Sequence, residues 1–134
     1  MPFTFALVLS LLLAAPAAFA QSGTVELELN KLEPVDDGCR AFFVVRNTSG
    51  TAFESLDLDL VTFRPDGVVG ARFQVELAPL AADKTVVKPF DFAGVDCGAI
   101  DRVLLNGIVA CAPLAPATCL AMIAPSSLGP EFFK

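Results

Sequence analysis

Four cysteines are the side chains of this sequence best suited to chemistry: Cys39, Cys97, Cys111 and Cys119. Catalytic thiol exchange usually relies on a Cys-x-x-Cys motif, which the sequence lacks. A zinc site is a second use of four cysteines, but the chain has no histidine and the spacings match no zinc module. An even number of cysteines in an exported chain is typical of a disulfide framework. We therefore predict two structural disulfides and expect neither a metal nor another cofactor.

Four cysteines allow three pairings, and their positions favour one of them. Cys39 begins the strand-like run CRAFFVV, and Cys97 stands two residues before the run AIDRVLL. Cys111 and Cys119 close a short Pro/Ala loop, CAPLAPATC. The alternative pair Cys97–Cys111 requires the apolar run between them to double back. We favour Cys39–Cys97 and Cys111–Cys119, which on the chain-entropy treatment contribute roughly 4 and roughly 2.5 kcal/mol.

Paired carboxylates are the remaining catalytic option, because without histidine the Ser-His-Asp and Cys-His arrangements are excluded. Asp57 and Asp59 share one face of a predicted strand, about 7 Å apart by strand rise. That separation suits two cooperating carboxyl groups. The alternative is a solvated outer face opposite a stripe of leucines. We favour the solvated face over an acid-pair hydrolase.

Two further motifs have both a functional and a structural interpretation. Asp36-Asp37-Gly38, Asp57 with Asp59, and Asp66-Gly67 could supply oxygens to calcium, although no EF-hand or RTX spacing is present. Asn47-Thr48-Ser49 fits the glycosylation sequon. Asn, Asp and Ser also bond their own backbone in turns. We favour turn and surface roles for both motifs.

Alternating apolar and polar residues predict the elements that position these groups. About seven short strands are indicated, at residues 24–30, 41–45, 54–63, 68–77, 85–92, 100–110 and 120–124. Arg64-Pro65-Asp66-Gly67 predicts a hairpin turn, and Pro89 assigns its strand to a sheet edge or a bulge. No helical segment separates the strands, which argues against a parallel α/β sheet.

The predicted fold class is an all-β, immunoglobulin-like antiparallel β-sandwich, linked by disulfides. It forms a single domain over residues 21–134, with a Pro/Ala-rich, disulfide-closed C-terminal segment over residues 111–134. The inward face of the clearest strand is Leu56, Leu58, Leu60 and Thr62. Tryptophan and tyrosine are absent, so the aromatic landmarks of antibody domains are missing and phenylalanines fill the core.

Residues 1–20 are predicted to be a cleavable signal peptide. The run from Phe5 to Leu13 is apolar apart from Ser10, and Ala18-Phe19-Ala20 places small residues before a cleavage site after Ala20. A membrane anchor is the rival interpretation, but Pro16 and the small-residue tail favour cleavage. We expect a periplasmic or secreted product with no stable membrane insertion.

The formal net charge of −6 restricts the class of partner. An acidic domain whose lysines and arginines are scattered singly is a poor ligand for nucleic acid or an anionic membrane. We therefore predict no nucleic-acid partner and consider another envelope protein or a peptide instead.

The middle of the chain resembles small exported bacterial immunoglobulin-like modules of the FxLYD type. The resemblance rests on Asn47-Thr48-Ser49, Phe63, Asp66-Gly67 and Leu77-Ala78-Pro79-Leu80, which follow the order of that family's turns. The chain is also similar to short periplasmic proteins of alphaproteobacteria. The resemblance implies an exported β-sandwich and no activity.

These observations predict a non-enzymatic exported module with an interaction or structural role. The alternative is a binder of a small apolar ligand or envelope component through a groove lined by Phe42, Phe43, Phe73, Phe90 and Phe92. For those phenylalanines, plain core packing is the simpler interpretation.

Overall fold

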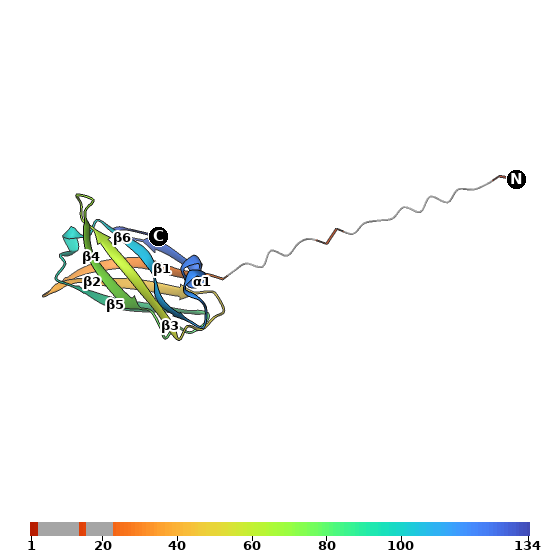
Figure 1. Cartoon of the computed structure of the whole chain (residues 1–134), viewed down its shortest axis with the longest axis horizontal. Helices are drawn as coiled ribbons and strands as arrows, with labels where there is room; N and C mark the ends of the chain where they lie inside the picture. Colours follow the sequence, from red (N-terminus) through yellow and green to blue (C-terminus); the bar gives the residue numbers. More distant parts are fainter. Residues whose placement is uncertain (3–13, 16–22) are drawn as a thin grey trace.

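The computed structural model describes residues 1–2, 14–15 and 23–134 (Figure 1). The greater part of the predicted signal peptide, residues 1–20, and the predicted cleavage site after Ala20 lie outside the described residues.

Two four-stranded sheets pack face to face (Figure 1). The first sheet has the order β5-β2-β1-β7 and consists of β1 (Val25–Val35), β2 (Gly38–Asn47), β5 (Lys84–Ala93) and β7 (Ile123–Ser127). The second has the order β4-β3-β6-β8 and consists of β3 (Ser55–Phe63), β4 (Val69–Glu76), β6 (Arg102–Ala112) and β8 (Glu131–Phe133). A 3-10 helix, η1 (Cys97–Ala99), and an α-helix, α1 (Pro116–Met122), complete the fold.

The predicted all-β sandwich is confirmed. Its C-terminal part differs from the prediction in three respects. Residues 120–124 were predicted to be a strand, but Leu120 belongs to α1 and β7 begins only at Ile123. β8 is an eighth strand that the pattern did not reveal. β7 and β8 pair parallel with β1 and β6, whereas the other pairings are antiparallel. These parallel pairs arise because the chain crosses between the sheets after β6 and again after β7.

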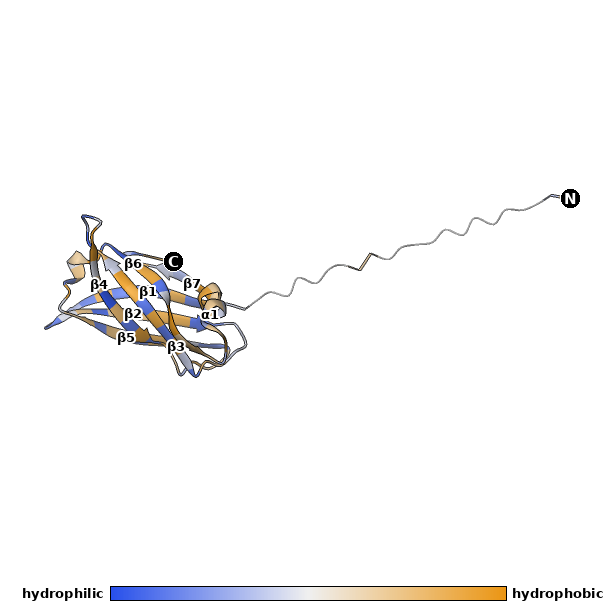
Figure 2. Cartoon of the chain, in the orientation of Figure 1, coloured by the Kyte–Doolittle hydropathy of each residue, from blue (hydrophilic) through white to orange (hydrophobic). Residues whose placement is uncertain are grey.

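The core lies between the two sheets, where the period-2 pattern places alternate side chains. Hydrophobic and hydrophilic bands alternate along the strands (Figure 2). The predicted inward residues Leu56, Leu58, Leu60 and Thr62 are all buried. They face buried side chains of the first sheet, which include Leu27, Leu29, Phe43 and Val45.

The predicted hairpin joins β3 to β4. Gly67 has a φ of 81° and donates its N–H to the Arg64 carbonyl at 2.8 Å. Asp66 accepts hydrogen bonds from the Arg64 guanidinium at 2.7 Å and from the Val68 N–H at 3.0 Å. Glycine and aspartate thus fix the turn as their chemistry predicts.

Candidate functional site

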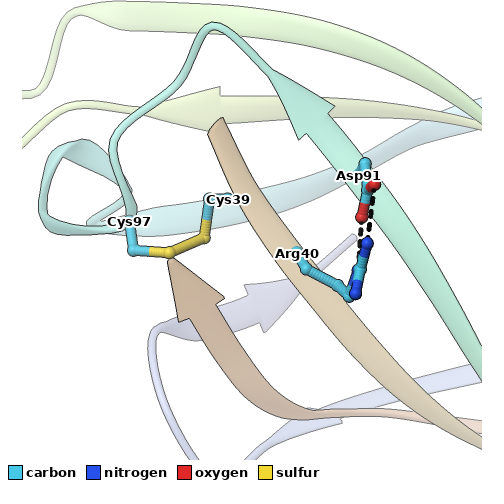
Figure 3. The surroundings of a disulfide bond; sticks show 4 residues. All are labelled: Cys39, Arg40, Asp91 and Cys97. Atoms are coloured by element: carbon cyan, nitrogen blue, oxygen red, sulfur yellow. Dashed lines mark hydrogen bonds and ion pairs between the residues drawn. A yellow bond between two sulfur atoms is a disulfide. The ribbon is translucent and has the colours of Figure 1, made fainter. Parts of the chain in front are cut away.

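The Cys39–Cys97 disulfide ties β2 to the connection that leads from the first sheet to the second. Cys39 lies at the start of β2 in the first sheet, and Cys97 opens η1, which leads into β6 of the second sheet. Figure 3 shows the bond beside the ion pair of Arg40 and Asp91, whose Nε–Oδ1 distance is 2.6 Å. The bond therefore anchors the connection between β5 and β6 to the first sheet.

The Cys111–Cys119 disulfide fastens α1 to the end of β6. The helix begins with Pro116, which suits the first turn because its missing N–H would have no partner there. Its last carbonyls accept hydrogen bonds from the Lys134 ammonium, at 3.0 Å from Leu120 and 2.6 Å from the following Ile123. The second half of the predicted loop is therefore part of a short helix, which is held by the disulfide at its middle and by Lys134 at its C-terminal end.

Asp57 and Asp59 both lie on the outer face of β3, as predicted, but Asp59 is not solvated. Only 8% of Asp59 is exposed, because side chains from both neighbouring strands cover it. Arg72 of β4 donates two hydrogen bonds of 2.7 Å to its carboxylate, and Asn106 of β6 donates one of 2.7 Å. Asp57 accepts a hydrogen bond from Gln74.

The hydrogen bonds from Arg72 hold the pKa of Asp59 below its ordinary value of 3.8, against the opposing effect of burial. An acid-pair hydrolase needs one carboxyl group with a raised pKa. The environment of Asp59 instead favours a permanent carboxylate. Its role is to join the three strands β4, β3 and β6 on their outer face.

The lowered pKa of Asp59 makes the free energy of unfolding depend on pH in a predictable way. Because its pKa is lower in the folded chain than in the unfolded chain, its contribution is present above pH 3.8 and is lost as the pH falls through the folded pKa. Without histidine, we expect the free energy of unfolding to vary little between about pH 5 and pH 8. Urea unfolding of wild type and Asp59→Asn across this range and into acid tests both points. The difference between the two proteins should vanish in acid; a difference that persists down to acid unfolding would contradict this role.

The remaining candidate acidic groups lie apart from one another. Asp36 and Asp37 form the turn between β1 and β2, and Asp66 binds Arg64 in the β3–β4 hairpin. Among the described residues, no three His, Cys, Asp or Glu side chains gather in a group that could hold a metal ion.

Asn47 is a structural residue at the end of β2. It is only 1% exposed, and its Nδ2 donates to the carbonyls of Thr51 at 2.7 Å and Ala81 at 3.0 Å. Its Oδ1 accepts from the Ser49 N–H and hydroxyl. A buried amide with these bonds has no free N–H to accept a glycan, so the turn interpretation of this sequon is the correct one.

The five phenylalanines considered for a ligand groove do not form one. Phe43 and Phe92 are each 1% exposed. Phe73 stacks on Phe92 with a centroid distance of 4.3 Å, and Phe90 packs near Phe43 at 6.0 Å. Phe42 points to the opposite face of β2, under the Lys31 ammonium. Four of the five residues thus pack in the core or against it, and Phe42 lies on the other face of β2, so the five do not line one surface.

The outer face of the first sheet is divided by charged pairs. Its apolar side chains Phe42, Val44 and Val87 lie between two ion pairs, Arg40–Asp91 and Arg46–Glu28. Lys31 covers the ring of Phe42 at 5.1 Å from its centroid. This arrangement is that of a solvated sheet face.

The outer face of the second sheet carries an apolar and aromatic surface instead. Thr62, Val103 and Phe132 are buried, so the residues next to them along each strand point outward. The strand register places these outward residues of neighbouring strands side by side. We call this surface the aromatic face; it consists of Val61, Phe63, Val69, Leu104 and Phe133 around Arg102.

Arg102 lies between two rings of the aromatic face. Its guanidinium carbon is 4.9 Å from the ring centroid of Phe63 and 5.6 Å from that of Phe133. The Asp101 carboxylate is 3.8 Å from its Nε, so the guanidinium also has an acidic neighbour. Stacking on rings keeps the arginine extended along the sheet, where its N–H groups remain available to a bound partner.

An apolar depression of about 440 Å³ continues the aromatic face towards α1. Leu104 belongs to both, and Ala117, Leu120 and Ala121 of the helix form the opposite wall. The Lys134 side chain lies at its border. The Cys111–Cys119 disulfide fixes α1 relative to β6 and therefore fixes the shape of this depression.

Sequence reasoning missed the aromatic face, for which the sequence holds one partial signal, at Phe63. Phe63 was identified only as a motif residue, and the period of its strand already places it with Val61, opposite the leucines. Phe133 and Arg102 come next to it only through the pairing of β8 with β6 and of β6 with β3, which the pattern did not predict.

No family model matches the chain, and no curated protein or solved structure is significantly similar to it. Within the described residues, neither helix has the length and hydrophobicity needed to cross a membrane.

Proposed function

We propose that this protein is a non-enzymatic, exported protein-binding module that acts in the periplasm or outside the cell. It binds another envelope protein through the aromatic face of its second sheet. The predicted signal peptide and the two disulfides support export, because disulfides form and persist in oxidising compartments. Membership of the FxLYD-type modules stays a prediction that agrees with this proposal.

The arrangement Phe63–Arg102–Phe133 is the observation that carries the proposal. Aromatic residues and arginine are enriched at the cores of protein interfaces and supply most of their hot spots. Here they lie together on one sheet face, with Leu104 and Val61 beside them. Both outer faces carry ion pairs, and the second sheet differs by combining an arginine with two aromatic rings. The depression beside α1 can receive an apolar side chain of the partner.

A small apolar ligand is the second candidate, now located beside α1 rather than among the core phenylalanines. The volume of the depression lies within the range of ligand pockets. Native mass spectrometry of the exported protein would favour this candidate if a low-mass compound copurified and the variant Leu120→Glu lost it.

Two matched valines allow a direct test of the protein-binding proposal. Val69 of the aromatic face and Val87 of the first sheet are each 59% exposed and lie on edge strands. We expect Val69→Asp to reduce recovery of envelope partners about tenfold or more in affinity capture, because it places an unpaired charge in a desolvated interface. Val87→Asp should capture as wild type does. Equal recovery by all three proteins, with unchanged unfolding midpoints, would contradict the proposal.

A further inference from the structure

The sandwich has four edge strands, and three of them are protected against pairing. The strand β5 carries Pro89 and the inward-facing Lys88. The strand β7 has five residues, including Pro125, and β8 has only three. Prolines, inward-pointing charges and shortness are the usual means by which proteins prevent edge-to-edge association.

The fourth edge strand, β4, has none of these features. It has eight residues without proline, and its inward-facing side chains are Ala71, Phe73 and Val75. Among the described residues, β3 is its sole sheet neighbour. A β-bulge interrupts its pairing with β3 between Val69 and Arg72, but the register from Arg72 to Glu76 is regular. A regular edge segment of this kind indicates a strand that receives a partner.

Hydrogen bonding shows which backbone groups of β4 are free. The Leu77 N–H, directly after β4, donates to the Leu56 carbonyl of β3 at 2.9 Å. Because bonded and non-bonded positions alternate in an antiparallel pair, Val75 and Phe73 also direct their backbone groups towards β3. The backbone groups of Arg72, Gln74 and Glu76 therefore point to the open edge.

We propose that β4 pairs antiparallel with β4 of a second copy of this chain, with Gln74 at the two-fold axis. This register bonds Gln74 to its counterpart and places Arg72 opposite Glu76 of the second copy, twice. It also places Phe73 opposite Val75 of the second copy. Opposite charges and apolar pairs at directly facing positions stabilise antiparallel strands.

Two neighbouring registers fit less well. Centring the pair on Phe73 leaves Arg72 opposite Gln74, and centring it on Arg72 places two arginines opposite each other, which is unfavourable. The Arg72 side chain is 71% exposed although it binds Asp59, so it can contact a second carboxylate without leaving the first. Charge complementarity of β4 with itself thus selects a second copy as the occupant.

The resulting dimer has one continuous eight-stranded sheet with both aromatic faces on the same side. Two equivalent sites on one surface would allow a bivalent contact with a repetitive or dimeric partner. The pairing itself does not depend on the function proposed for the aromatic face.

Sedimentation equilibrium of the exported protein tests the pairing. Gln74→Pro removes an N–H that faces the open edge and no backbone hydrogen bond to β3. It also removes the side-chain hydrogen bond to Asp57, but the backbone pairing of β4 with β3 is kept. We expect wild type to be dimeric at micromolar concentrations and Gln74→Pro to weaken the dimer by about a hundredfold or more. Val87→Pro is the matched control, because Val87 also directs its N–H to an open edge, that of β5; it should dimerise as wild type does.

A second variant separates the ion pair from the backbone. Glu76 Oε1 accepts hydrogen bonds from the N–H groups of Leu56 at 2.7 Å and Ala78 at 2.8 Å, and a glutamine can keep both. Glu76→Gln should therefore fold normally and raise the dimer dissociation constant about three- to tenfold at low salt.

Amide hydrogen exchange locates the contact. The Arg72 and Gln74 amides should become protected as protein concentration rises, and the Val87 amide should not. A wild-type chain that stays monomeric at millimolar concentration would overturn the proposal, as would a dimer unaffected by Gln74→Pro or equally disrupted by Val87→Pro.

Discussion

Removing the disulfide between β2 and η1, with Cys39→Ala and Cys97→Ala together, is expected to lower the free energy of unfolding by about 4 kcal/mol. The bond closes a loop with a sequence separation of 58 residues, so its absence releases a large conformational entropy in the unfolded chain. The total free energy of unfolding of a small domain is only about 5–15 kcal/mol, so the variant should be close to unfolding.

The second disulfide provides the comparison. Cys111–Cys119 has a separation of only 8 residues, and its removal should cost about 2.5 kcal/mol. Its loss should also release α1 and reduce binding by the aromatic face. Urea unfolding of the two double variants measures both losses of stability, and affinity capture measures the loss of binding. If the short-loop variant proved the less stable, the assignment of the larger stabilisation to the long loop closed by Cys39–Cys97 would be contradicted.

Phe43→Ala is expected to have the second large effect and to lower the free energy of unfolding by about 3–5 kcal/mol. Phe43 is 1% exposed and its ring lies 5.6 Å from that of Phe132 in the opposite sheet and 6.0 Å from that of Phe90. Truncation leaves a cavity between the layers that close-packed neighbours can fill only in part.

The adjacent residue is the matched control. Phe42 has the same side chain on the same strand, but it points outward under Lys31. Phe42→Ala should cost about 1 kcal/mol or less. Equal losses for the two variants, measured by thermal and urea unfolding, would show that the alternation assigned to β2 is wrong.

The parts of the fold that local pattern predicted are those in which local sequence and tertiary environment agree. Leu56, Leu58 and Leu60 alternate with polar residues and are buried. Pro65 and Gly67 lie in the expected hairpin, and Pro89 lies on an edge strand. In each case the residue type carries its own geometric preference, so one sequence is sufficient.

The parts that the pattern missed depend on non-local contacts. The sequence pattern predicts a solvated Asp59. Its partners Arg72 and Asn106 are distant in sequence and contact it from two other strands. β8 has three residues, too few for a detectable period, and it is a strand because β6 offers an edge. The seven residues of α1 hold their helix with a disulfide and the Lys134 ammonium rather than with an amphipathic repeat.

In the candidate site, too, the locally determined features were predictable and those that depend on non-local contacts were not. The cysteines were identified from spacing, because a disulfide framework leaves a signal in the sequence. The aromatic face combines Phe63, Arg102 and Phe133 from three strands, and only the sheet register brings them together. A surface of this kind has no sequence signature.

Photo-crosslinking in cells that export the protein naturally tests its proposed binding role most directly. A photoreactive phenylalanine analogue would replace Phe133 or Leu104 in the aromatic face, and Val44 or Val87 on the opposite face of the sandwich. We predict a discrete protein adduct from the two positions of the aromatic face, which disappears when Val69→Asp is added, and no such adduct from the other two. Adducts from Val44 and Val87 alone, or from none of the four positions, would contradict a partner-binding role for the aromatic face.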